Sequence, residues 1–349
     1  MRSRFARVPG IRLLLRSRSI ARSYVARLPL RFLGASVVGV LGAMCASCTD
    51  KVALVDVVDA STDGPSRPPV CGPAEREARA IAGVPIGLGD ARVIMARAGV
   101  VYALLVRPDG SGVLARTVGD VLREVATVGR DPIGLAVDDR YAYVIAKGTS
   151  EVLRVDGAGN VRSAPNQAAT HLTVGRHGRA VWSTGDTIVA WDFQAGAPAM
   201  VVRKSDVTGL LHDENDLFVT TPGRLFRIRA TDGAESAWAA ACGEGIASIS
   251  SDVVYCADGN TVFALSLATG ASSPFATNQR GASTVVTSRG RVLWRTNRTE
   301  SLGSVVWFAK DGLGVPSAIS RADGATSLIA ADGCTVYFLS DRTLFARSL

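Results

Sequence analysis

The chain has 349 residues, with 39 basic and 31 acidic side chains and a formal net charge of +8. Nine arginines fall within residues 1–31, which contain no acidic residue, and the rest of the chain has 30 basic against 31 acidic residues. This balance excludes the basic surface with which nucleic-acid-binding proteins neutralise phosphates.

The first segment has the order of a secretory leader, in which an arginine-rich start is followed by a short apolar run at residues 32–44. The run is shorter than the roughly 20 residues that a membrane-spanning helix needs. It ends in GAMCASC, which resembles the lipobox of bacterial lipoproteins, where an acylated cysteine becomes the new first residue. We expect acylation at Cys48, with Cys45 as the second choice. The prediction is a lipoprotein signal peptide over residues 1–47 and a protein anchored by lipid in the cell envelope, on the periplasmic or cell-surface side.

Other interpretations of this segment stay open. It also fits an ordinary cleaved signal peptide or an organelle transit peptide, and the true start codon can lie downstream of Met1. Residues 48–70 are rich in aspartate and proline and are expected to form a flexible tether. The spacing of the aspartates does not match a calcium-binding loop of the EF-hand type.

The remainder of the chain repeats with a period of about 40 residues. An aromatic residue ends an apolar run in each copy, and successive copies lie 41, 39, 36, 37, 39 and 43 residues apart. The seven aromatic anchors are Tyr102, Tyr143, Trp182, Phe218, Tyr255, Trp294 and Tyr337. A second apolar run follows each anchor after a turn, and both runs alternate as strands do. Such a period predicts a repeat architecture.

Each repeat has room for four strands, the size of one β-propeller blade. A blade alone cannot cover both of its faces, so we expect residues 71–349 to form an all-β, seven-bladed propeller. The seven anchors should then pack between blades. Because the chain stops after the third strand of the last repeat, residues 78–84 are expected to supply the missing strand and close the ring.

Four cysteines lie beyond the leader, and an exported chain meets an oxidising compartment where disulfides form. Four cysteines allow three connectivities, and the spacing alone does not choose among them. We predict the pairs Cys71–Cys334, which would latch the closing strand, and Cys242–Cys256.

The repeats resemble bacterial propellers with quinoprotein-like, NHL-like or YVTN-like blades. VFALSLATG is similar to the core of quinoprotein-type blades, and AYVIAKGTSEVLRVDGAGN is similar to a YVTN or NHL unit. The chain lacks the repeated Trp-Asp dipeptide, the Kelch double glycine and the sialidase Asp box. The resemblance implies the fold and leaves function open.

Candidate chemistry is sparse. The three histidines occupy different positions in their repeats, so they do not predict a metal cage. His171 opens the first strand of the third repeat, where propeller tunnels are lined, and is the candidate for acid or base work. The other interpretation is a partly exposed histidine at a strand end. No nucleophile motif is present, and no metal or cofactor is predicted.

These observations favour a monomeric, non-catalytic binding or scaffold protein with a protein or cell-envelope partner and no nucleic-acid partner. In outline it resembles the propeller lipoprotein of the outer-membrane barrel-assembly machinery. The alternative is a propeller enzyme of the lactonase or lyase type, with His171 near the tunnel and a bound divalent cation. Sugar or cell-wall binding through the turns stays a third possibility.

Overall fold

The structure is a computed structural model. It describes residues 77–349 apart from 166, 176–177, 195–196, 214–215, 230–232, 240–241, 243–248, 251, 289–290, 297–303, 312–313 and 324–327. The chain divides into two units, Met1–Thr49 and Asp50–Leu349, and every described residue belongs to the second. The expected signal peptide, the tether and the acylation sites Cys48 and Cys45 lie outside the described residues and stay predictions.

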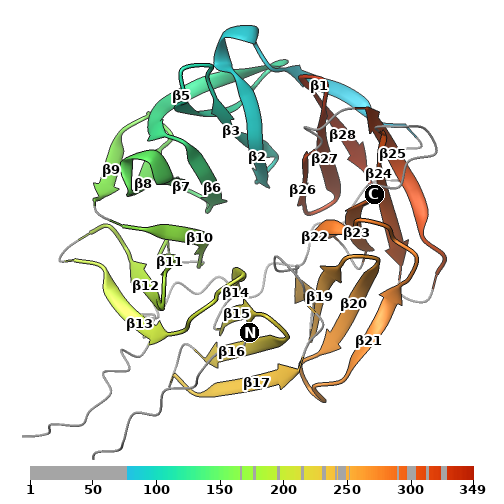
Figure 1. Cartoon of the computed structure of the whole chain (residues 1–349). Coiled ribbons are helices and arrows are strands. Elements are labelled where there is room, and N and C mark those ends of the chain that lie inside the picture. The colour runs from blue at the N-terminus through green and yellow to red at the C-terminus, as the bar shows by residue number, and fades with distance from the viewer. Residues whose placement is uncertain are drawn as a thin grey trace, which may run out of the picture. The chain divides into compact units, whose positions relative to one another are not determined.

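Antiparallel β-sheets make up almost all of the described structure (Figure 1). The largest sheet has eight strands in the order β2-β3-β4-β5-β1-β28-β27-β26. Its strands are β1 (Arg79–Gly83), β2 (Asp90–Arg97), β3 (Val100–Val106), β4 (Ser111–Val118), β5 (Val121–Arg130), β26 (Leu328–Asp332), β27 (Thr335–Ser340) and β28 (Thr343–Ser348). A short 3-10 helix, η1 (Ile86–Leu88), lies between β1 and β2.

Five further sheets have four strands each, in sequence order. The first contains β6 (Pro132–Val137), β7 (Tyr141–Ala146), β8 (Glu151–Asp156) and β9 (Val161–Ala164), with the 3-10 helix η2 (Lys147–Thr149) before β8. The second contains β10 (Ala169–Val174), β11 (Ala180–Thr184), β12 (Thr187–Trp191) and β13 (Ala199–Arg203). The third contains β14 (Gly209–Asp213), β15 (Asp216–Thr221), β16 (Arg224–Arg229) and β17 (Glu235–Ala239). The fourth contains β18 (Ile249–Ser250), β19 (Val253–Asp258), β20 (Thr261–Ser266) and β21 (Ser272–Ala276). The fifth contains β22 (Ser283–Ser288), β23 (Arg291–Thr296), β24 (Ser304–Asp311) and β25 (Ser317–Asp323).

The sheets of this unit stand around a common centre, with the first strand of each innermost (Figure 1). Among these inner strands, β2 contacts β6 and β26, β10 contacts β6 and β14, and β22 contacts β26. Four-stranded sheets in this arrangement form a β-propeller.

The apolar cores lie between sheets. The described residues form seven buried hydrophobic clusters, and each cluster joins side chains of two neighbouring groups of strands. For example, Leu104 and Leu114 of β3 and β4 pack with Val144 and Leu153 of β7 and β8. Successive apolar side chains of a strand point to opposite faces of its sheet. One set therefore packs against the preceding sheet and the other set against the following sheet.

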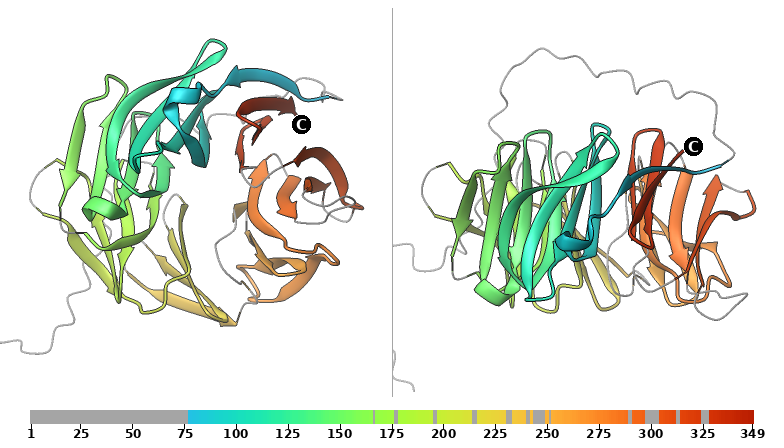
Figure 2. Two further views of the ribbon diagram at one scale, coloured as in Figure 1. Left: turned by 45° about the horizontal axis from the view of Figure 1, so that its top comes forward. Right: turned by 90° about the horizontal axis from the view of Figure 1, so that it is seen from above.

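Strand β1 joins the two ends of the described chain. It pairs antiparallel with β28, from Arg79 opposite Ala346 to Gly83 opposite Thr343, and it meets β5 through one parallel pair, Gly83 with Val121. Figure 2 shows β1 reaching from the β2–β5 strands to the strands near the C-terminus. The N-terminal segment expected in the last repeat therefore lies beside its third strand.

The seven aromatic anchors each lie on the second strand of a four-strand repeat. Five of them are buried, namely Tyr143, Trp182, Phe218, Trp294 and Tyr337. Tyr102 and Tyr255 are half-buried and pack against the edges of the inter-sheet clusters. A tyrosine at these two positions keeps contact with water.

A disulfide joins Cys242 to Cys256 with an S–S distance of 2.03 Å. Cys334, the last residue of the turn before β27, is also disulfide-bonded. Its expected partner, Cys71, lies outside the described residues, so that pairing stays a prediction.

Within the residues that the structure describes, no helix has the length and apolar character needed to cross a membrane.

Candidate functional site

His171 lies on β10, the innermost strand of its sheet, next to an irregularity in the pairing with β11 between Ala169 and His171. Its Nδ1 is 3.1 Å from Thr170 Oγ1 and 3.1 Å from Ser183 Oγ. The two hydroxyl oxygens are themselves 2.8 Å apart. The imidazole is thus held by neutral groups, and its tunnel-lining role stays a prediction.

The surroundings of His171 set its charge. Burial lowers the pKa of the imidazole below its ordinary value, because desolvation disfavours the charged form. A lowered pKa keeps the ring neutral at pH 7. A neutral imidazole held by two hydroxyls is a hydrogen-bonding group and a weak base.

Of the other two histidines, the structure describes one. His212 lies on β14, where its backbone N–H donates to Thr173 Oγ1 at 3.0 Å, and His177 falls outside the described residues. The described ranges contain no group of three or more His, Cys, Asp or Glu side chains that could hold a metal ion.

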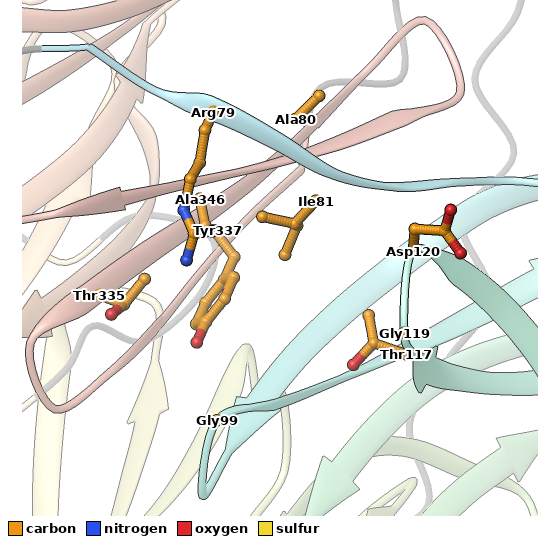
Figure 3. A pocket seen from close by; sticks show the side chains of 10 residues that line it. All are labelled: Arg79, Ala80, Ile81, Gly99, Thr117, Gly119, Asp120, Thr335, Tyr337 and Ala346. Carbon is orange, nitrogen blue, oxygen red and sulfur yellow. The ribbon is translucent and has the colours of Figure 1, made fainter.

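A cavity of about 460 Å³ lies where β1 bridges the β2–β5 strands and the β26–β28 strands (Figure 3). We call it the junction cavity. Its walls come from β1, from β27 and β28, and from the turns that follow β2 and β4. The described lining residues are Arg79, Ala80, Ile81, Gly99, Thr117, Gly119, Asp120, Thr335, Tyr337 and Ala346. The volume falls within the usual range for small-ligand sites, about 300–1,000 Å³.

The two charges of the junction cavity stand on opposite walls. Figure 3 shows Arg79 beside Tyr337 and Thr335 on one side, and Asp120 beside Thr117 and Gly119 on the other. Neither Arg79 nor Asp120 makes a side-chain hydrogen bond or ion pair with another residue in the described part of the chain. Both charged groups are therefore open to a ligand or to water.

The polar groups between these charges are held in place. The backbone N–H of Gly99 donates to Asp332 Oδ2 at 2.6 Å, which ties the two ends of the sheet together beside the cavity. Burial raises the pKa of the Tyr337 hydroxyl, and the nearby Asp332 carboxylate raises it further. The hydrogen bond with Thr335 and the charge of Arg79 act in the opposite direction. Tyr337 therefore stays protonated and can donate a hydrogen bond near neutral pH.

The groups that line the junction cavity can bind a ligand. It offers a guanidinium, a carboxylate and hydroxyl groups, and its described lining includes no histidine or cysteine. The sequence did not predict this cavity. The expected docking of residues 78–84 on the last repeat pointed to the junction, but nothing in the sequence indicates that the strands leave space there.

No protein-family model matches the sequence, and no curated protein matches it. The fold is similar to that of solved structures at low sequence identity. A virginiamycin B lyase from Staphylococcus aureus has a TM-score of 0.58 and 14% identity, over 79% of this chain and 100% of that one. BamB from Moraxella catarrhalis has a TM-score of 0.50 and 15% identity, over 80% and 99%.

The WD40 domain of Neurospora crassa Pan2 has a TM-score of 0.59 and 13% identity, over 80% of this chain and 98% of that one. At such identities the likeness shows the fold alone, and proteins of this fold differ widely in function. The described part of the chain is a β-propeller.

Proposed function

We propose that the protein is a lipid-anchored, extracytoplasmic, seven-bladed β-propeller that binds or scaffolds other molecules without catalysis. In this proposal residues 1–47 are a lipoprotein signal peptide, Cys48 carries the lipid, residues 48–70 are the tether, and the propeller body is a monomer.

Seven blades in a closed ring are supported by the seven inter-sheet clusters. One of these clusters joins the first repeat to the last, with Ala82 of β1 packed among residues of both. Pairing of β1 with β28 supplies the strand that the last repeat lacks.

The junction cavity is the observation that carries the binding role. Its opposite charges and hydroxyls suit a ligand or a protein segment that makes hydrogen bonds and ion pairs. Burial keeps His171 neutral and its ring contacts two hydroxyls, which suits a hydrogen-bonding role in binding.

The test is chemical cross-linking of the tagged, full-length protein in intact cells, followed by identification of the cross-linked partner. The double variant R79Q/D120N should lose that partner, while R224Q/D258N, which removes one charge of each sign from exposed positions elsewhere, should keep it. Equal cross-linking in both variants would contradict the role of the cavity. One tightly held divalent cation per purified chain, together with lactonase or lyase turnover that H171Q abolishes, would favour the enzyme alternative.

Lipid anchoring has its own test. Labelled palmitate should be incorporated into the wild-type chain and the C45A variant and be absent from C48A. Label retained in C48A and lost in C45A would move the anchor to Cys45, and label in none would remove the lipid from the proposal.

A further inference from the structure

A second cavity, of about 320 Å³, lies between the outer strands of the β2–β5 group and the turn that follows β8. We call it the arginine groove. Its described lining residues are Arg116, Val118, Arg123, Glu124, Val125, Gly157 and Ala158. Arg116 of β4 is half-buried and Arg123 of β5 is exposed. Two guanidinium groups therefore share one groove outside the junction cavity.

The two arginines stand directly opposite each other in an antiparallel pair. Such neighbours have Cβ atoms about 4.5–5.5 Å apart, and like charges there destabilise the sheet. A β-bulge produces this pairing. Leu114 pairs with Ala126, but the next residue, Ala115, pairs with Glu124, so Val125 is the extra residue.

The bulge changes the charge pattern of the groove. Without it the register would place Arg116 opposite Glu124, a favourable pair of opposite charges, and the bulge places Arg116 opposite Arg123 instead. Bulges of this kind re-aim side chains near functional sites. A local change of register thus replaces an attractive pair with a repulsive one.

Glu124 does not neutralise the two arginines. Its carboxylate accepts a hydrogen bond from Arg107 Nη2 at 2.5 Å and another from Thr127 Oγ1 at 3.2 Å. Among the described residues, neither Arg116 nor Arg123 makes a side-chain hydrogen bond or an ion pair. The groove therefore has two guanidinium groups free to bind an anion.

The opposite wall of the arginine groove, the turn that follows β8, lies close to the bulge. Gly159, at φ +87°, lies so near that a Cβ there would stand 2.4 Å from the carbonyl oxygen of Val125. A Cβ on Gly157 would stand 3.4 Å from Arg116 Nη1. Asp156, the acidic residue of this turn, is occupied, because its carboxylate accepts hydrogen bonds from Ala158 N and Asn160 N, each at 2.9 Å. The glycines bring the turn against Arg116 without adding a counter-charge.

We propose that Arg116 and Arg123 form a binding site for a dianionic oxyanion, specifically a phosphate group that is free, on a small molecule or in a lipid headgroup. A phosphate monoester carries close to two negative charges at neutral pH and can accept hydrogen bonds from both guanidinium groups. Its charge removes the repulsion that the bulge creates. This site is separate from the junction cavity and does not depend on the function proposed above.

Binding is measured on the full-length C45A/C48A protein, which lacks both candidate lipid sites. The two measurements are calorimetric titration with glycerol phosphate, and flotation with vesicles of phosphatidylcholine with or without phosphatidic acid. R116Q and R123Q should each weaken binding about 10-fold or more, as expected for the loss of a charge-assisted hydrogen bond. R116K and R123K, which keep the charge but lose the planar fork, should have intermediate affinity. R224Q removes one exposed positive charge from another sheet and should bind as the wild type does.

A stability measurement separates binding from a structural role. In phosphate-free buffer R116Q and R123Q should melt at the wild-type temperature or above it, because one of two repelling charges is gone. Glycerol phosphate should raise the melting temperature of the wild type and of R224Q and leave R116Q/R123Q unchanged.

Binding to vesicles without binding to glycerol phosphate, with the same dependence on both arginines, would identify the headgroup as the source. Wild-type affinity in the double variant, or no binding of any of these phosphates, would overturn the proposal. So would a fall of several degrees in the melting temperature of the single variants, which would make the two arginines structural.

Discussion

Trp294 Nε1 donates a hydrogen bond to Gln279 Oε1 at 3.1 Å, and both side chains are buried. Trp182 and Gln167 repeat this relationship in an earlier sheet at 3.3 Å, with the same separation of 15 residues. The backbone N–H of Gln279 donates to the carbonyl oxygen of Asn260, in the turn between β19 and β20, at 2.7 Å. The glutamine therefore ties one sheet to the tryptophan of the next.

Replacing Gln279 with methionine should keep the volume of the side chain and remove the acceptor of the indole N–H. We expect the free energy of unfolding to fall by about 1–3 kcal/mol, the cost of a lost hydrogen bond at a buried site. Denaturation by urea measures it. The control is Q194M at an exposed glutamine, and equal losses in the two variants would show that the Gln279 hydrogen bond contributes nothing.

Tyr143 should make the protein less stable at alkaline pH. Its hydroxyl lies 2.9 Å from Asp138 Oδ2 and 2.7 Å from the carbonyl oxygen of Gly178 in the neighbouring sheet. Burial raises the pKa of Tyr143, and Asp138 raises it further. The stabilisation is complete below the unfolded pKa of about 10 and is lost as the pH rises above it. The free energy of unfolding, measured from pH 8 to pH 11, should fall in the wild type and fall less in Y143F. Parallel pH profiles of the two proteins would contradict this prediction.

His171 should make the protein less stable at acid pH. Because burial lowers its pKa in the folded protein, the unfolded chain binds a proton more readily, and stability falls as the pH drops below about 6.5. The pKa of Asp156 is lowered too, chiefly by its hydrogen bonds with Asn160, so its effect begins at lower pH. NMR titration should give His171 a pKa below the ordinary value, and H171Q should flatten the stability profile between pH 7 and pH 5. A His171 pKa above 6.5 would show that the imidazole has an acidic neighbour or is exposed.

Strand β1 offers a matched pair of variants for ring closure. Ala82 is 5% exposed inside the cluster that joins the first and last repeats, whereas Ala80 on the same strand is exposed. A82D should therefore lower the free energy of unfolding by about 3 kcal/mol or more, since it buries a charge without a partner. A80D should change it by no more than about 0.5 kcal/mol. Thermal unfolding measures both, and a mild effect of A82D would mean that β1 leaves the sheet at little cost.

The strand pattern and the propeller fold follow from the sequence because the period and the alternation of apolar residues are repeated in every copy. The degree of burial follows less well. Trp294 and Tyr255 occupy equivalent second strands, yet Trp294 is fully buried and Tyr255 is half-buried. The packing of a neighbouring sheet decides this difference, and an alternating pattern within one strand carries no information about it.

The candidate sites depend on contacts that the sequence does not encode locally. Ser183 lies 12 residues beyond His171 and reaches it only through the pairing of β10 with β11. Arg116 and Arg123 face each other only because Val125 is bulged. In a regular hairpin Arg116 would lie opposite Glu124 and could form an ion pair with it. One bulged residue therefore replaces an expected attraction with a repulsion.

The pairing of β1 with β28 also bears on how the chain folds. Residues 79–83 leave the ribosome long before residues 343–346, their partners in the sheet. Strand β1 must wait for its antiparallel partner until β28 has been synthesised, and contacts between such distant residues slow folding. Until then β1 lacks its antiparallel neighbour, and an unpaired strand edge is the state most exposed to proteases and to pairing with another molecule.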